Sequence, residues 1–277
     1  GGVVSELVLA GDGRMYGTSS TGGAFDLGTI FEFDPTTSML QVVHSFDGTD
    51  GAHPDSGLVI GTDGLLYGVT PQGGGAGWDS GTGPRGTVFS FAPSTGQLLT
   101  LHVFEFVSGQ TNAFPGGATP SGPLVQASNG LLYGTTSELG PNGQGTVFGI
   151  DPATSAFITL HAFAGADGAQ PEAGVVEGRD GALLGTTSRG GADDYGTLFR
   201  LEKTGALTTL VSFDGSNGRS PLGELFVDGD GAVYGTTVDG GASGQGTVFR
   251  LSPGGAFATL HSFDGNDGAQ PFTRLAS

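Results

Sequence analysis

Leu132-Tyr133-Gly134-Thr135, Gly145-Thr146-Val147-Phe148 and His161-Ala162-Phe163 decide the fold, because all three stretches recur in order along the chain. The interval between copies is about 50 residues, which is typical of a tandem array of supersecondary units. The first stretch returns at Met15-Tyr16-Gly17-Thr18, Leu66-Tyr67-Gly68-Val69, Leu184-Gly185-Thr186 and Val233-Tyr234-Gly235-Thr236. The second returns at Gly28-Thr29-Ile30-Phe31, Gly86-Thr87-Val88-Phe89, Gly196-Thr197-Leu198-Phe199 and Gly246-Thr247-Val248-Phe249. The third returns at His44-Ser45-Phe46, His102-Val103-Phe104, Val211-Ser212-Phe213 and His261-Ser262-Phe263.

Each unit is expected to contain four strands. In the third unit, residues 124–127 form the first strand and Asn129-Gly130 a two-residue turn that requires positive φ, followed by a strand over 131–136. A glycine-rich hairpin leads to strands over 145–150 and 157–163. No stretch has the 3.6-residue period of an amphipathic helix, so the chain is predicted to be all-β.

Three hairpins followed by one crossover of about ten residues are typical of a propeller blade whose outer strand leads to the inner strand of the next blade. A β-solenoid is the alternative, but its coils are usually shorter. We therefore predict one domain over 1–277, a five-bladed β-propeller of four-stranded blades. The repeats are expected at about 1–50, 51–113, 114–167, 168–217 and 218–267, with a partial copy at 268–277.

Composition excludes several functions. The chain has 27 acidic and 9 basic residues, a formal net charge of −18, and no cysteine. This charge argues against binding nucleic acid, whose phosphates require a basic surface. No run of apolar residues is long enough for a membrane span, so no membrane insertion is expected. The abundance of Gly, Thr, Ser and Asp with few lysines favours a secreted or cell-surface protein.

The three repeated stretches, together with the Gly-Gly pairs between them, resemble the extracellular tandem repeat named for Gloeobacter and Verrucomicrobia. The resemblance covers nearly the whole chain. It implies an exported, propeller-like repeat protein of bacterial surfaces or secretions, and it brings no catalytic motif that could be transferred to residues of this chain.

The C-terminal stretch Gly268-Ala269-Gln270-Pro271 copies the start of a unit and then stops. It is expected to close the ring by pairing with the N-terminal segment, because an unpaired edge strand promotes aggregation. A chain that belongs to a longer array of repeats is the alternative.

Repeated residues build the scaffold, so departures from the repeat are the better functional candidates. The histidines 44, 102, 161 and 261 and the tyrosines 16, 67, 133 and 234 are therefore interpreted as structural. The second unit departs most, with an insertion that carries Trp78, Asp79 and Arg85 and a long crossover that carries Asn112. An aromatic plane flanked by hydrogen-bonding groups is typical of a sugar site, although Trp78 could instead pack its own loop.

Carboxylates provide the catalytic hypothesis. Glu6 and Glu224 occupy the position before the inner strand in the first and fifth units, and Arg274 occupies it in the partial copy. In a closed ring these residues would converge on the axis, where paired carboxylates could hydrolyse a glycosidic bond. Variation between terminal blades is the competing explanation.

His53 and Tyr195 are two further departures. His53 is the one histidine outside the repeated position and could act as a general base, although an exposed loop histidine is the commoner case. Tyr195 precedes Gly-Thr where the other units have Leu27, Arg85, Gln144 and Gln245, and this variety favours one asymmetric site over five equal ones.

No cofactor is required by any of these candidates. Calcium is an open alternative at Asp47-Gly-Thr-Asp50, Asp214-Gly-Ser-Asn217 and Asp264-Gly-Asn-Asp267, although tight turns select the same residues. No other metal site is expected. The sequence predicts a secreted, monomeric, carbohydrate-active propeller that degrades a polysaccharide as a hydrolase or lyase; a non-catalytic glycan-binding or adhesion module, or a structural segment of a longer surface protein, remains the alternative.

Overall fold

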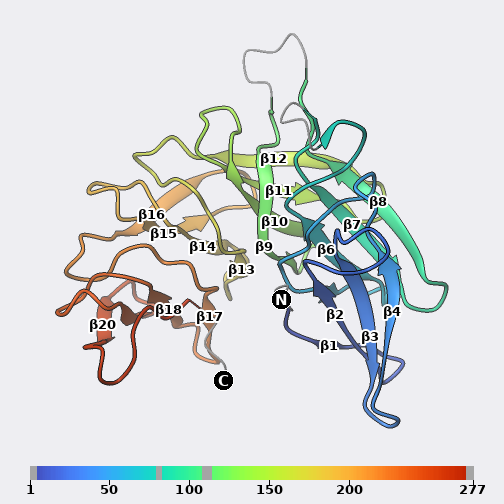
Figure 1. The fold of residues 1–277 in the computed structure, drawn as a ribbon. Helices are drawn as coiled ribbons and strands as arrows, with labels where there is room; N and C mark the ends of the chain where they lie inside the picture. Colours follow the sequence, from blue (N-terminus) through green and yellow to red (C-terminus); the bar gives the residue numbers. More distant parts are fainter. Residues whose placement is uncertain (1–4, 79–82, 108–113, 273–277) are drawn as a thin grey trace.

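The chain folds into five four-stranded antiparallel sheets that follow one another around a common axis (Figure 1), as expected for a five-bladed β-propeller. The computed structural model describes residues 5–78, 83–107 and 114–272. In each sheet the strands are in sequence order.

Blade 1 contains β1 (Val8–Leu9), β2 (Met15–Ser19), β3 (Thr29–Asp34) and β4 (Met39–Ser45); blade 2 contains β5 (Val59–Ile60), β6 (Leu66–Thr70), β7 (Thr87–Ala92) and β8 (Gln97–Val103). Blade 3 contains β9 (Ala118–Gln126), β10 (Leu132–Glu138), β11 (Thr146–Ile150) and β12 (Phe157–Ala162); blade 4 contains β13 (Val176–Glu177), β14 (Leu183–Thr187), β15 (Thr197–Leu201) and β16 (Leu207–Ser212); blade 5 contains β17 (Phe226–Val227), β18 (Val233–Thr237), β19 (Thr247–Leu251) and β20 (Phe257–Ser262).

The four strands predicted in the third unit are present, with one turn that differs. Ala127 and Leu131 are joined by a backbone hydrogen bond of 2.9 Å, so three residues, 128–130, form the turn. Only Gly130 has positive φ there, at 83°. The extra residue lets a right-handed turn end in one left-handed glycine, where a two-residue turn would need two residues with positive φ.

A phenylalanine ring covers a glycine inside every blade. Gly134 of β10 lies opposite Phe148 of β11, and a Cβ atom on Gly134 would lie 2.6 Å from the tip of that ring. Phe148 is fully buried as a result. The same pairing joins the glycine of Tyr-Gly-Thr to the phenylalanine of Gly-Thr-Val-Phe in the other blades, at Gly17 and Phe31, Gly68 and Phe89, Gly185 and Phe199, and Gly235 and Phe249.

Three of the four repeated histidines contact an aspartate in the crossover that follows their own strand. Nε2 of His161 lies 2.8 Å from Oδ2 of Asp167, whose other oxygen accepts the amide of Ala164. His44 and His261 make the same contact with Asp50 and Asp267, at 2.7 Å and 2.6 Å. Their structural role, expected from repetition, follows from this geometry.

His102 differs because the crossover after it carries the insertion. Its ring stacks on Phe157 of the next blade, with centroids 3.7 Å apart and planes 5° from parallel. Burial in this apolar setting lowers the pKa of His102 to about 4. Unlike an exposed histidine, it stays neutral in mildly acidic solution.

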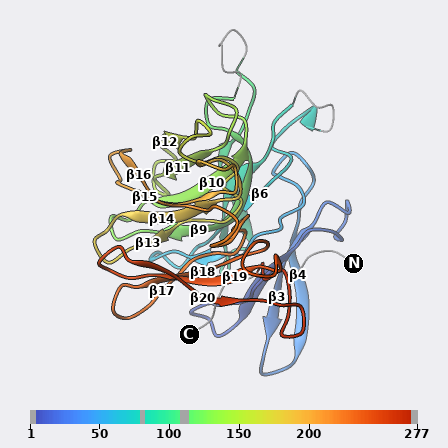
Figure 2. The ribbon, with the colours of Figure 1, turned by 90° about the vertical axis from the view of Figure 1, so that its left-hand side faces the viewer.

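Blades 1 and 5 are the first and last blades of the array and carry the blue and the red ends of the described chain in Figures 1 and 2. Ser5 pairs with β2 of its own blade through a 3.0 Å bond from its amide to the carbonyl of Thr18. In the described residues, each sheet therefore consists of four strands that are consecutive in the sequence. The predicted pairing of the 268–277 copy with the N-terminal segment includes residues 273–277 and 1–4, which lie outside the described part, and it stays a prediction.

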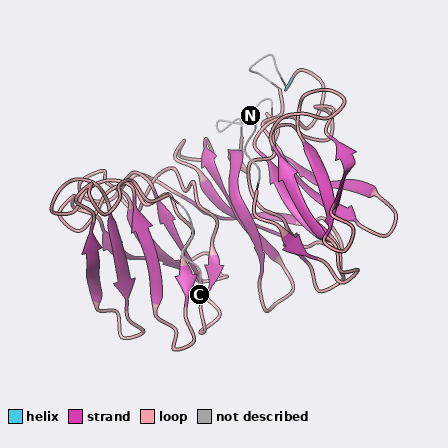
Figure 3. Ribbon diagram, turned by 60° about the horizontal axis from the view of Figure 1, so that its bottom comes forward, coloured by secondary structure: helices cyan, strands magenta, loops and turns pink. Residues whose placement is uncertain are grey.

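All regular structure in the described residues is strand (Figure 3), apart from turns and a single helical residue in the 71–78 loop. None of them forms a helix that is long and apolar enough to cross a membrane.

The apolar contacts between blades can be tested with two phenylalanines at the same repeat position. Phe213 is fully buried between blades 4 and 5, whereas Phe263 at the end of blade 5 is only half-buried. Phe213→Ala should lower the free energy of unfolding by about 3–5 kcal/mol, because a large buried ring leaves a cavity. Phe263→Ala should cost less than half as much. Urea denaturation of both variants measures this, and equal losses would contradict the described packing.

The pKa of His102 predicts how stability depends on pH. The folded-state pKa of about 4 lies below the ordinary value of 6.5, so the unfolded chain takes up the proton first as the pH falls. Stability is therefore complete above pH 6.5 and decreases between pH 6.5 and pH 4, by up to roughly 3 kcal/mol. His102→Gln should reduce this slope in urea denaturation across that window; an unchanged slope would show that His102 is not the group responsible.

Candidate functional site

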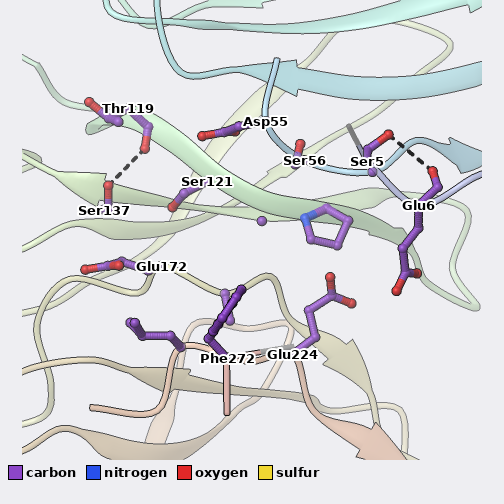
Figure 4. A pocket seen from close by; sticks show the side chains of 15 residues that line it. Ser5, Glu6, Asp55, Ser56, Thr119, Ser121, Ser137, Glu172, Glu224 and Phe272 are labelled. Carbon is purple, nitrogen blue, oxygen red and sulfur yellow. Dashed lines mark hydrogen bonds between the residues drawn. The ribbon is translucent and has the colours of Figure 1, made fainter. Parts of the chain in front are cut away.

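A cavity of about 460 Å³ lies on the propeller axis, where the chain enters the blades (Figure 4). Its wall is built from the lead-in segments, which we define as the five residues that begin with the proline of each crossover. These are 54–58, 120–124, 171–175 and 221–225, together with 5–7 before blade 1 and 271–272 after blade 5. Residues from all six lead-in segments line the cavity.

Glu6 and Glu224, the predicted catalytic pair, both line this cavity. They also line a second cavity of about 280 Å³ further along the axis, together with Val8, Val59 and Val125 of inner strands. Figure 4 shows the two carboxylates at the same end of the axial cavity. The structure therefore brings together two glutamates that are 218 positions apart in the sequence (224 − 6). Arg274, predicted beside them, lies outside the described residues.

Two further carboxylates, Asp55 and Glu172, line the same cavity. The sequence did not predict these two residues, because they lie outside the position directly before each inner strand at which Glu6 and Glu224 stand out. Asp55 and Glu172 follow the crossover proline two positions earlier, where the other units have Ser121, Leu222 and Phe272. The variety at this position is the signal that could have found them.

The surroundings of these two carboxylates differ. Asp55 is exposed to the open cavity, but the protein around the cavity desolvates its carboxylate and raises the pKa of Asp55 above its ordinary value, so Asp55 keeps its proton to higher pH than an aspartate in open solution. Glu172 instead accepts a hydrogen bond of 3.1 Å from the hydroxyl of Ser188. The cavity thus contains one carboxyl group whose raised pKa suits it to donate a proton.

Hydroxyl groups and one aromatic ring complete the cavity wall. Ser5, Ser121 and Ser137 line it, and the hydroxyl of Ser137 donates to the carbonyl oxygen of Thr119 at 3.2 Å. The ring of Phe272 is 69% exposed at the edge of the cavity, so its apolar surface is available to a ligand. An aromatic plane beside hydroxyls and carboxylates offers the contacts that a sugar ring uses.

Trp78 and Arg85 line a separate cavity of about 380 Å³ with Glu138. Nη1 of Arg85 lies 3.7 Å from Oε2 of Glu138, and its guanidinium lies 5.8 Å from the ring centroid of Phe114. Thr119 lines both this cavity and the axial one, so the two are neighbours. Asp79 and Asn112, also predicted here, lie outside the described residues.

Trp78 packs against the preceding crossover as well as lining its cavity. Its indole lies over Gly48, and its ring centroid is 6.4 Å from that of His53. The indole therefore packs on the crossover before blade 2, a contact that neither interpretation named, while the residue also borders a cavity, and a sugar site at Trp78 stays a prediction.

His53 and Tyr195 do not line the axial cavity or the Trp78 cavity. Nδ1 of His53 lies 2.8 Å from the carbonyl oxygen of Ser20, a contact that requires a proton on Nδ1. Tyr195 packs at the interface of blades 4 and 5, under the guanidinium of Arg219 at 5.4 Å. The structure therefore does not bring either residue to the glutamates.

The three Asp-rich loops use their oxygens to form their own turns. Oδ1 of Asp47 accepts hydrogen bonds from the amide and the hydroxyl of Thr49, at 2.8 Å and 2.6 Å. Asp214 accepts the corresponding bonds from Ser216. Within the described ranges, no group of three or more histidine, aspartate or glutamate side chains is arranged to hold a metal ion.

Comparison with family models gives two overlapping matches to the Gloeobacter/Verrucomicrobia repeat, over residues 1–115 and 81–277. The chain belongs to the Gloeobacter/Verrucomicrobia repeat family. The resemblance expected from Tyr-Gly-Thr, Gly-Thr-Val-Phe and His-Ser-Phe is thereby confirmed. No curated protein matches this member of the family by sequence.

Solved structures similar to this Gloeobacter/Verrucomicrobia repeat protein share its fold at low identity. TolB from Acinetobacter baumannii superposes with a TM-score of 0.51 at 14% identity, over 92% of this chain and 53% of TolB. A gluconolactonase from Xanthomonas campestris gives 0.55 at 12% identity, over 94% and 75%. The nidogen/laminin complex gives 0.57 at 13% identity, over 98% and 83%. The chain spans about half the length of TolB, and these likenesses show the β-propeller fold alone.

Gly48 offers a direct test of the position of Trp78, the only tryptophan in the chain. A Cβ atom on Gly48 would collide with Nε1 of Trp78, whereas Gly265 at the same repeat position has open space around it. Both glycines have positive φ, 87° and 91°, so an alanine strains the backbone equally at the two sites. Gly48→Ala should shift tryptophan fluorescence to longer wavelength as the indole moves toward water. Gly265→Ala should leave the spectrum unchanged, and a shift in neither variant would contradict the contact.

Proposed function

We propose that the axial cavity binds a neutral polysaccharide outside the cell and hydrolyses its glycosidic bonds. The observation that carries the proposal is the convergence of Glu6, Glu224 and Asp55 on one cavity whose wall also presents hydroxyls and the exposed ring of Phe272. Glycoside hydrolysis needs two carboxyl groups on opposite sides of a scissile bond, one protonated and one ionised.

Asp55 is assigned as the general acid because desolvation by the surrounding protein raises its pKa. It donates its proton to the glycosidic oxygen as the bond from that oxygen to the anomeric carbon breaks. A water molecule adds to the anomeric carbon and gives its proton to Glu6 or Glu224. The second glutamate stabilises the positive charge that develops on the sugar.

The net charge of −18 restricts the substrate. An acidic polysaccharide would be repelled by the ionised carboxylates of the cavity, so neutral chains are favoured. A location outside the cell is supported by the composition and by a fold likeness to the extracellular domain of a one-component system from B. thetaiotaomicron, with a TM-score of 0.52 at 13% identity. The gluconolactonase likeness is one of fold and does not define the substrate.

The neighbouring cavity with Trp78 and Arg85 supports a second, non-catalytic function in glycan binding. An indole beside a guanidinium and a carboxylate can hold a sugar without cleaving it. As an alternative to hydrolysis, the protein is then a glycan-binding or adhesion module.

The hydrolase proposal predicts new chain ends. The protein is incubated with neutral plant and algal polysaccharides, and reducing ends, unsaturated ends and retention on the polysaccharide are measured. Glu224→Gln and Asp55→Asn should each reduce the release of reducing ends by about 10²–10⁴-fold. Glu202→Gln is the matched control, because Glu202 pairs with Arg200 away from the cavity. Retention without new ends would contradict hydrolysis and favour the binding module, whereas unsaturated ends would identify a lyase.

The raised pKa of Asp55 also predicts the pH profile. Activity should decrease as the pH rises through that pKa, because the proton donor is lost. If residual activity of Asp55→Asn shows the same alkaline decrease, another group is the acid.

A further inference from the structure

Adjacent blades are joined by the same apolar interface in each of four places. Each interface combines a forward face of one blade with a rear face of the next. The forward face is defined by the positions of Tyr16, Ile30 and Phe46, and the rear face by those of Leu58, Leu66 and Phe91. Four clusters of described residues join blades 1 and 2, 2 and 3, 3 and 4, and 4 and 5 in this way.

The forward face of blade 5 has no covering blade among the described residues. Tyr234, Val248 and Phe263 are each partly exposed. At the same positions in the other blades, the tyrosines are 1% exposed and the phenylalanines 0–1%. Those buried equivalents are Tyr16, Tyr67 and Tyr133, and Phe46, Phe104, Phe163 and Phe213.

The rear face of blade 1 is exposed in the complementary way. Leu7 is 46% and Leu9 60% exposed, and Met15 and Phe33 are partly exposed. The residues that correspond to Leu7 are almost completely buried, at 1–5%. They are Leu58, Leu124, Val175 and Leu225. Blade 5 thus has the apolar residues of a forward face and blade 1 has those of a rear face, but in the described residues the two faces do not pack on each other.

The crossover after blade 5 makes the same contacts as a crossover that leads to a following blade. The amide of Gln270 donates to the carbonyl of Gln245 at 2.9 Å, as His53 does to Leu27 at 2.7 Å. Pro271 packs against Gly246 as Pro54 packs against Gly28. Gln270 and His53 share a positive φ, 52° and 56°.

This crossover delivers Phe272 into the axial cavity, at the position that Asp55 and Glu172 occupy in their units. Six lead-in segments therefore surround the cavity, whereas five blades are present. The sixth lead-in segment lies between blades 5 and 1.

We propose that the forward face of blade 5 and the rear face of blade 1 together receive a sixth blade of the same repeat. Its chemistry is set by the faces: a four-stranded antiparallel sheet with leucine or valine at the Leu58 and Leu66 positions on one side and tyrosine and phenylalanine on the other. The inference goes beyond the proposed function and does not depend on it, since the sixth blade would complete the ring whatever the cavity binds.

The test supplies the sixth blade within the full chain. In an extended chain, Leu275, which corresponds to Leu225, is followed by a second copy of residues 226–267. The extended chain should be a monomer by light scattering, unfold in one transition at a higher temperature, and protect the amides of β2 and β19 from hydrogen exchange. An added segment that remains protease-sensitive, with unchanged exchange in β2 and β19, would overturn the proposal.

A matched pair of surface variants locates the added blade. Leu9 on the rear face of blade 1 and Leu99 on the outer strand of blade 2 are 60% and 56% exposed. Leu9→Glu should lower the unfolding temperature of the extended chain and leave the original chain unchanged, because Ile60 at the same position of blade 2 is partly buried against blade 1. Leu99→Glu should affect neither chain.

Two outcomes for the original chain would contradict the sixth blade. If Leu9→Glu destabilises the original chain as a monomer, blade 1 already packs on blade 5 and the ring closes with five blades. If the original chain forms an oligomer that Leu9→Glu dissociates, the faces are occupied by a second copy of the chain.

Discussion

The phenylalanine ring that covers a glycine in each blade is the contact on which the rest of the structure depends. Any side chain on Gly134 would collide with Phe148, and the ring reaches its buried position only because the glycine leaves room. The two residues belong to neighbouring strands, so the contact fixes their register as well as the position of the ring. The ring then packs against the preceding blade. One local pairing therefore sets strand register, blade core and interface between blades.

Because these roles are concentrated in a few residues, the strands of the repeat could be predicted from the sequence with small errors. The strands of the third unit were predicted to within one or two residues at most ends, since alternating apolar residues and Gly-containing turns define them. The first strand was predicted too short: β9 begins at Ala118, before the lead-in segment. Its first half pairs with the end of β10 after a shift in register. Such a bulge is decided by contacts across the sheet, which the sequence of one strand does not contain.

The candidate site was only partly predictable, for a related reason. Glu6 and Glu224 could be found because they are acidic at a position that is glycine or proline in the three middle units. Asp55 and Phe272 occupy a position that differs in every unit, so no single residue there stands out. His53 shows that a residue can be unusual in sequence without lining the axial cavity, because adjacent positions of a crossover have different surroundings.

The position of the site on the lead-in segments separates its chemistry from the stability of the fold. Each lead-in segment that follows a crossover is held by the proline and by the backbone hydrogen bond before it, and neither uses the side chains that face the cavity. A carboxylate, a hydroxyl or an aromatic ring can therefore occupy the position of Asp55 without disturbing the blades. The number of blades then sets both the width of the cavity and the number of side chains that it receives. Phe272 follows the fifth blade, so completion of the ring and composition of the site are coupled through one segment. A blade that packed between Phe263 and Leu9 would fix the ring of Phe272 relative to Glu6 and Glu224, and would thereby set the geometry of the cavity as well as close its wall.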